Sequence, residues 1–138
     1  MNWLHWSLLS AIFAGATAIL AKVGTKDIDA NLATAFRTVI VLATALPLAL
    51  WTNKLPIRAI PGSTWGWLTL SGIATSASWL CYFHALKVGD ASRVAPVDKL
   101  SVVVAMALAA LLLGETVTAM HWLGGVLILA GSLLIAWK

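Results

Sequence analysis

The chain has 138 residues, of which 61% are hydrophobic and only 10% are charged, and its mean hydropathy is +0.94. Since soluble domains carry about 25% charged residues, this composition excludes an ordinary soluble domain and indicates an integral membrane protein. The net charge of +4 comes from basic residues that stand singly in short loops, which favours membrane topology over nucleic-acid binding. The single cysteine, Cys81, excludes an intrachain disulfide and a cysteine-built metal site.

Five apolar segments follow one another, each near the roughly 20 residues that a membrane-spanning helix requires. The connections between them are short and carry turn signals such as Pro56, Pro61 and Gly89-Asp90. The sequence therefore predicts an all-α membrane protein, a single domain over residues 1–138 that forms a five-transmembrane-helix bundle. The predicted helices cover residues 3–23, 32–51, 65–86, 94–114 and 120–137.

The basic residues predict an orientation in the membrane. An odd number of spans places the termini on opposite sides, here called side A for the N-terminal side and side B for the other. Side A holds Lys54 and Arg58, whereas side B holds Lys22, Lys26, Lys87, Arg93 and Lys138. The positive-inside rule thus mildly favours an external N-terminus and a cytoplasmic C-terminus, while dual insertion remains open. Tryptophans at the predicted helix ends support the layering, because indole rings prefer the membrane interface.

Several ionisable residues fall inside the predicted spans, where charges need partners or a function. Arg37 lies about five residues into the second helix from side B, and Asp98 and Lys99 lie at a similar depth in the fourth. Lys22 and His84 lie at the side B ends of the first and third helices. These five residues are expected to share one layer of the membrane.

Asp98 and Lys99 are not expected to neutralise each other, because neighbours on a helix point about 100° apart. Arg37 and Lys22 lie at compatible depths to pair with Asp98, and Lys99 has a stem long enough to reach side B. Three structural alternatives remain open. In the first, Asp98 is a carboxylate at the start of the helix, close to Pro96. In the second, Arg37 is a topological residue whose side chain reaches the membrane interface. In the third, the two residues form a structural ion pair.

The third helix carries a predicted polar stripe and one internal tryptophan. A spacing of four, three and four residues places the side chains of the stripe on one helix face: Ser71, Thr75, Ser78 and Tyr82. The stripe serves either close helix packing or a water-accessible pocket. Trp79 is either a packing or lipid-facing ring or one wall of a substrate cavity. No nucleophile motif, metal-ligand spacing or phosphate-binding loop is present, so we expect neither an enzyme nor a bound cofactor or metal.

The ordered set of motifs resembles one EamA domain of the drug/metabolite transporter superfamily. The similarity covers essentially the whole chain and rests on Arg37 in Ala-Phe-Arg-Thr, Trp79-Leu-Cys-Tyr-Phe-His-Ala-Leu, Asp90-Ala-Ser-Arg-Val-Ala-Pro-Val-Asp-Lys-Leu-Ser, Leu113-Gly-Glu115, Gly124-Gly and Ala130-Gly. The resemblance implies one half of a ten-helix transporter, because family members usually carry two such domains in one chain. It also implies a location in the bacterial cytoplasmic (inner) membrane.

The resemblance implies a secondary transporter subunit that moves a small metabolite, amino acid or drug-like solute, for example in efflux, by alternating access. Two chains would supply the two halves, either as a homodimer, for which an antiparallel arrangement is attractive, or as a heterodimer with a second five-helix chain. The first, third and fourth helices would line the pathway, with Asp98 binding a proton or a cationic group and Arg37 as its counter-ion. The alternative is a non-transporting scaffold or accessory subunit of another membrane protein. The expected partners are the lipid bilayer and a small-molecule substrate, and no nucleic acid.

Overall fold

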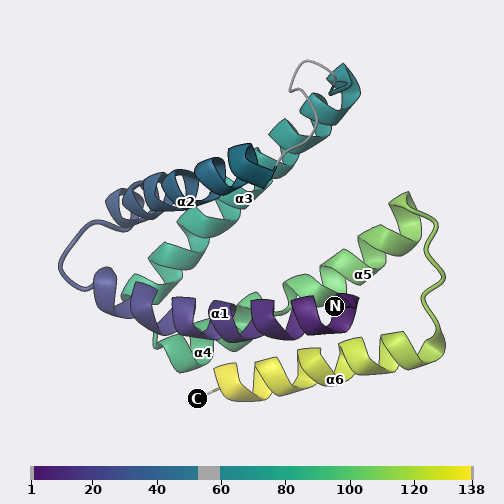
Figure 1. Cartoon of the computed structure of the whole chain (residues 1–138). Helices are drawn as coiled ribbons and strands as arrows, with labels where there is room; N and C mark the ends of the chain where they lie inside the picture. Colours follow the sequence, from purple (N-terminus) through teal and green to yellow (C-terminus); the bar gives the residue numbers. More distant parts are fainter. Residues whose placement is uncertain (1, 53–59, 138) are drawn as a thin grey trace. The chain divides into compact units, whose positions relative to one another are not determined.

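The computed structural model describes residues 2–52 and 60–137, in which every regular element is an α-helix (Figure 1). The helices are α1 (Trp3–Gly24), α2 (Ala30–Thr52), α3 (Gly62–Val88), α4 (Ala91–Asp98), α5 (Ser101–Leu112) and α6 (Ala119–Ala136). Since α4 and α5 belong to one apolar segment, Ala91–Leu112, the described chain has five helical segments and the predicted fold class is confirmed. Lys54, Pro56, Arg58 and Lys138, which entered the predicted loops and charge bias, lie outside the described residues.

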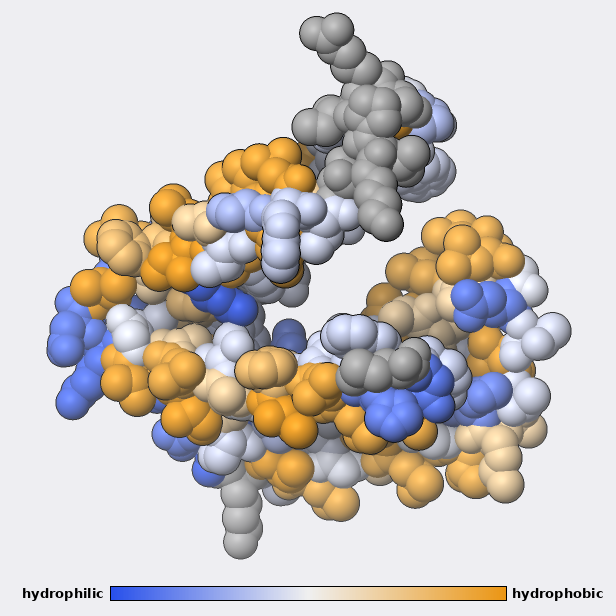
Figure 2. Space-filling view, in the orientation of Figure 1, coloured by the Kyte–Doolittle hydropathy of each residue, from blue (hydrophilic) through white to orange (hydrophobic). Residues whose placement is uncertain are grey.

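Four of the helical segments are long and apolar enough to cross a membrane: Trp3–Gly24, Ala30–Thr52, Ala91–Leu112 and Ala119–Ala136. The α3 helix has 27 residues and is long enough, but serine, threonine and glycine dilute its apolar residues, and it is not among the four. Large apolar side chains are exposed along all five segments, and they cover much of the face shown in Figure 2. This exposure is expected of helices that contact lipid tails rather than water. The chain is an integral membrane protein.

The helices form two compact units. The terminal unit comprises Met1–Leu20 and Val88–Lys138, and the central unit comprises Ala21–Lys87. Each unit positions a different group of the predicted site residues.

In the terminal unit, α6 packs along α4 and α5. Two small residues of α6, Gly125 and Ser132, are buried at this contact; they lie seven residues apart and therefore on one helix face. A Cβ at Gly125 would lie 3.5 Å from the Cε of Met106 on α5. The Ser132 hydroxyl donates a hydrogen bond of 2.9 Å to the carbonyl oxygen of Pro96 on α4. Small residues and a hydroxyl thus join these helices closely, as is typical in membranes.

The central unit has a small apolar core where α2 begins and α3 ends. Phe83 of α3 is 3% exposed and packs against Ala30 and Ala33 of α2, with Ala21 and Tyr82 at the edge of the cluster. Leu86, one turn further along α3, is 0% exposed. The alanines permit this approach because they present only a methyl group to the aromatic ring.

Asp29 starts α2. Its Oδ1 accepts hydrogen bonds from the backbone N–H groups of Asn31 (2.8 Å) and Leu32 (3.2 Å), which have no partner within the helix. These two bonds, and then the nearby positive charges of Lys87 and His84, lower the pKa of Asp29 below its ordinary value of 3.8.

The helix cap predicts a loss of stability in acid. Because the pKa of Asp29 is lower in the folded than in the unfolded chain, its stabilising effect is full above the unfolded value and disappears as the pH falls through the folded value, below about pH 4. We expect Asp29→Ala to lower the melting temperature at pH 7, followed by circular dichroism in detergent. Asp29→Asn keeps the cap and cannot titrate, so its melting temperature should fall less between pH 5 and pH 3 than that of the wild type. Identical acid sensitivity of the wild type and Asp29→Asn would contradict this assignment.

Candidate functional site

The fourth helical segment changes its hydrogen bonding next to Asp98. The N–H groups of Lys99 and Leu100 donate to the carbonyl oxygens three residues earlier, Pro96 and Val97, at 3.1 and 3.0 Å. Val102 and Val103 do the same toward Lys99 and Leu100, both at 3.0 Å. This is the pattern of a tight 3₁₀ turn, and such a turn in the middle of a helix often marks a functional hinge. The alternative that Pro96 belongs to the first turn of this helix is wrong, because α4 begins five residues earlier at Ala91 and ends at Asp98.

Asp98 and Lys99 meet at this turn. The Nζ of Lys99 lies 3.5 Å from Oδ2 of Asp98, and the two side chains are 54% and 36% exposed, respectively. The prediction that these neighbours do not neutralise each other is therefore wrong. The directions of the two Cα–Cβ bonds differ, but the long flexible stem of Lys99 carries its ammonium back to the carboxylate of Asp98. The prediction that Asp98 is a helix-start carboxylate is wrong as well, since Asp98 is the last residue of α4.

In the central unit, Arg37 of α2 lies over aromatic rings of α3. The guanidinium carbon is 4.3 Å from the centre of the Trp79 ring and 5.5 Å from that of Phe83. Both distances are within the roughly 6 Å that defines a cation–π interaction. Tyr82 packs edge-on to Phe83, with ring centres 6.4 Å apart. Trp79 is half-buried and supports the one arginine of α2, a pairing that the sequence did not reveal.

Three further basic residues of the central unit have backbone partners: Lys22, Lys87 and His84. The ammonium of Lys22 donates a hydrogen bond of 2.6 Å to the carbonyl oxygen of Leu86, in the last turn of α3, where carbonyls lack helical partners. Lys87 donates to the carbonyl oxygen of Ile28 in the loop before α2. The Nδ1 of His84 lies 2.9 Å from the carbonyl oxygen of Leu80 and so donates to it, while the ring is exposed.

The predicted polar stripe of α3 is only partly available to a ligand. The Thr75 hydroxyl donates to the carbonyl oxygen of Ser71 at 2.9 Å, which satisfies it within its own helix. Ser71 and Ser78 are exposed, and Tyr82 is half-buried next to Phe83. The role of the stripe in packing or in a pathway stays a prediction.

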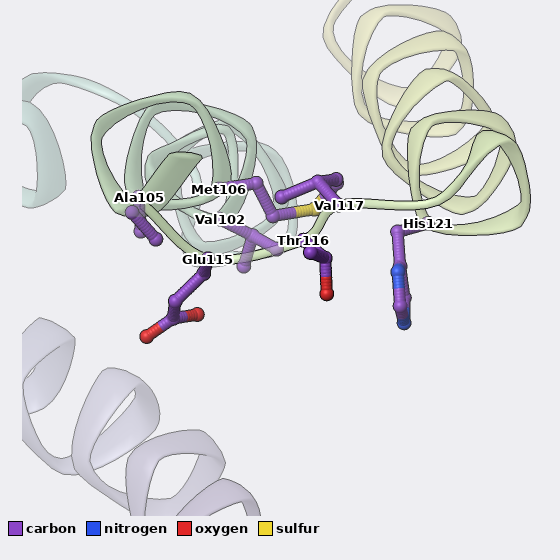
Figure 3. Close-up of a pocket in the computed structure, with 8 residues that line it drawn as sticks. Val102, Ala105, Met106, Glu115, Thr116, Val117 and His121 are labelled. Atoms are coloured by element: carbon purple, nitrogen blue, oxygen red, sulfur yellow. The ribbon is translucent and has the colours of Figure 1, made fainter. Parts of the chain in front are cut away.

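A cavity of about 410 Å³ opens in the terminal unit between α5 and the start of α6 (Figure 3). Its walls are mostly apolar, with Glu115 and His121 as the titratable residues. The Nδ1 of His121 accepts the backbone N–H of Thr118 at 3.1 Å, which caps α6. Gly114, with φ of 66°, ends the preceding segment in a conformation that favours glycine. Sequence reasoning overlooked the His121 partner, although the spacing of three residues from Thr118 matches a capping box.

The five residues predicted to share one membrane layer belong to both units. Lys22, Arg37 and His84 lie in the central unit, and Asp98 and Lys99 lie in the terminal unit. The common layer, and with it the pairing of Asp98 with Arg37, stays a prediction. Within residues 2–52 and 60–137, no group of three or more His, Cys, Asp or Glu side chains is arranged to hold a metal ion.

Comparison with known proteins places these features in a family. The model of the EamA-like transporter family matches residues 1–137. A protein of Sinorhizobium sp., named an uncharacterized transporter in the cobO 3′ region, is 50% identical over 136 residues, which are 98% of this chain and 96% of that protein. No solved structure matches the chain significantly. By the extent of both matches, the chain belongs to the EamA-like transporter family and has the role of a transporter.

Proposed function

We propose that the chain is one subunit of a secondary transporter that moves a small metabolite, amino acid or drug-like solute across the cytoplasmic membrane of a bacterium. The observation that carries the proposal is the 3₁₀ turn with Asp98 and Lys99 inside an apolar segment, Ala91–Leu112. Transporters commonly place their solute and ion sites where a membrane helix is interrupted, because backbone groups and charges become available there.

The proposed role of Asp98 is to bind a proton or a cationic group during the transport cycle. Its contact with Lys99 is 3.5 Å long and both side chains are partly exposed, so the pair is weak and Lys99 is readily replaced. A carboxylate that exchanges its partner in this way can couple proton or cation binding to movement of the helices on either side of the turn. Asp98 is the one acidic residue within the described helices, which makes it the single candidate there for this role.

We further propose that two copies form the complete transporter. Families with paired domains use the interface between two related halves as the pathway, and the halves rock around a site near the middle of the membrane. In this proposed assembly a second copy of the chain supplies the other half. An antiparallel homodimer reproduces an inverted repeat, and a partner chain of opposite orientation would serve equally.

Transport in proteoliposomes tests the proposed site. Uptake is measured with a panel of radiolabelled amino acids, organic acids and amines, first for the wild type. For a solute that is transported, we expect Asp98→Asn and Arg37→Ala to lower the initial rate at least about tenfold, since each removes a charge from the pathway. Asp27→Asn, which changes an exposed loop carboxylate, is the matched control. Full transport by both site variants would reduce Asp98 and Arg37 to structural residues.

Reporter fusions test the proposed assembly. A reporter active only in the cytoplasm and one active only outside it are fused in turn to each terminus. The antiparallel homodimer predicts that both reporters are active at the same terminus, because the chain inserts in two orientations. Activity of a single reporter at each terminus would rule out the antiparallel homodimer and leave a parallel dimer or a second chain.

A further inference from the structure

Arg37 is a cation inside an apolar helix. It lies seven residues after Ala30, the first residue of α2, which corresponds to about 10 Å along the helix axis. At that depth a charge is costly, and intramembrane charges usually face a partner or a water-filled cavity. The question is which anion balances Arg37.

The described helices of the central unit do not supply that anion. Neither α2 nor α3 contains an acidic residue. Within the described helices the one acidic side chain is Asp98, and Lys99 lies 3.5 Å from it. Asp29 is the nearest carboxylate along the chain, but it lies just before the first residue of α2. Its carboxylate already accepts hydrogen bonds from two backbone N–H groups of that helix. In the described part of the central unit, no hydrogen bond or ion pair joins Arg37 to an acceptor.

The aromatic contact leaves the guanidinium able to bind an anion. Its carbon lies 4.3 Å from the centre of the Trp79 ring, within cation–π range. The five N–H donors of an arginine lie in the plane of the group and point outward from its edges. A cation–π contact uses none of these donors, so they remain available for two parallel hydrogen bonds to an anion.

The N–H donors of Arg37 suit a carboxylate, and the aromatic rings nearby suit the apolar part of a solute. Arginine binds planar carboxylates through two N–H groups at once. Trp79, Phe83 and Tyr82 provide aromatic surface beside the guanidinium. A lipid phosphate has similar chemistry but is held at the membrane interface, whereas Arg37 lies about 10 Å inside the helix. The depth thus favours a solute over a headgroup.

We propose that Arg37, supported by the ring of Trp79, binds the carboxylate of a small organic anion that the transporter carries. The inference rests on the proposed transport function and adds the chemical class of the solute. In this proposal the counter-ion of Arg37 is the carboxylate of the solute, and not Asp98 as the sequence-based hypothesis had it.

Binding of benzoate to the full chain in an uncharged detergent tests the proposal, with benzamide as the uncharged analogue of the same shape. Isothermal titration calorimetry should give binding of benzoate to the wild type at least about tenfold tighter than binding of benzamide. Arg37→Gln should abolish the preference for benzoate, and Arg37→Lys should weaken it, because lysine keeps the charge without the planar pair of donors. Arg93→Gln, at an exposed residue of α4, should leave it unchanged.

Three results would overturn the anion site. The first is equal binding of benzoate to the wild type and to correctly folded Arg37→Gln, with folding checked by circular dichroism. The second is binding that appears only in Asp98→Asn, which would mean that Asp98 neutralises Arg37. The third is displacement of benzoate in nanodiscs by phosphatidylglycerol but not by phosphatidylcholine, which would assign the site to lipid headgroups.

The binding assay is independent of transport, so the two proposals fail separately. Selective benzoate binding by a chain that moves no solute in proteoliposomes would keep the anion site and remove the transport function. Transport of a cationic or neutral solute that Arg37→Gln retains would keep the transport function and remove the anion site.

Discussion

Gly125→Leu is expected to disrupt the packing of the terminal unit. A Cβ at this position would already lie 3.5 Å from Met106 Cε, 3.7 Å from Met106 Sδ and 3.7 Å from Val103 Cγ2. The three further carbons of leucine have no space there, so α6 must move away from α5. Overpacking of this kind typically costs about 1–3 kcal/mol in folding free energy. The measurement is the midpoint of thermal unfolding in detergent, which should fall clearly below that of the wild type.

Two substitutions control for the change in side-chain chemistry. Gly124→Leu places the same side chain on the neighbouring residue, where a Cβ has no atom within 4 Å, and should leave the midpoint nearly unchanged. Gly125→Ala brings only an ordinary van der Waals contact and removes a flexible glycine from a helix, so it should be neutral or stabilising by up to about 1 kcal/mol. Equal destabilisation by Gly124→Leu and Gly125→Leu would show that α6 does not pack through Gly125.

Leu86→Ala is expected to destabilise the central unit. The Leu86 side chain is 0% exposed, and its removal leaves a cavity at the end of α3. In a membrane, moving a leucine side chain from lipid to the protein interior gains little free energy, because lipid tails are equally apolar. The free energy lost in Leu86→Ala is therefore that of its van der Waals packing contacts. We expect about 1–3 kcal/mol, below the upper range for soluble cores. The carbonyl that accepts Lys22 is retained, so the change isolates the side chain.

Leu68→Ala is the matched control on the same helix. Leu68 is 57% exposed and faces the surroundings of the chain, where a lipid or detergent tail fills the space that the leucine vacates. Its thermal unfolding midpoint should stay close to that of the wild type. If Leu68→Ala lowered the midpoint as much as Leu86→Ala, the described exposure of α3 would not hold in the membrane.

The sequence predicted the membrane class, the helical fold and the approximate bounds of the helices correctly. These properties follow from composition and from the length of each apolar segment, which are local and do not depend on how the helices pack. The third and fourth helices differ most at their boundaries: they were predicted over residues 65–86 and 94–114 and are observed as Gly62–Val88 and Ala91–Leu112, the latter divided into α4 and α5. The motifs also sufficed to name the family that the comparison confirmed.

The candidate site was predicted less well, because side-chain partners depend on backbone geometry that a sequence does not fix. Asp98 and Lys99 were assigned to different directions on a helix, but the flexible stem of Lys99 brings its ammonium within 3.5 Å of the Asp98 carboxylate. Lys22 was treated as a partner for a carboxylate, but it binds the carbonyl oxygen of Leu86, 64 residues away along the chain. A backbone carbonyl leaves no signal in the sequence, since every residue carries one.

Depth in the membrane was thus set by the sequence, and contact was set by the tertiary structure. Counting residues placed Arg37 inside the second span, but only the packing of α2 on α3 brings its guanidinium over Trp79. Likewise, Gly124 and Gly125 are equivalent in the sequence, and only the rotation of α6 directs one of them at Met106. The physical reason is the same in both cases. Hydrophobicity and helix rise determine how far along the membrane normal a residue lies, whereas the rotation of each helix is fixed only by the close packing of its neighbours.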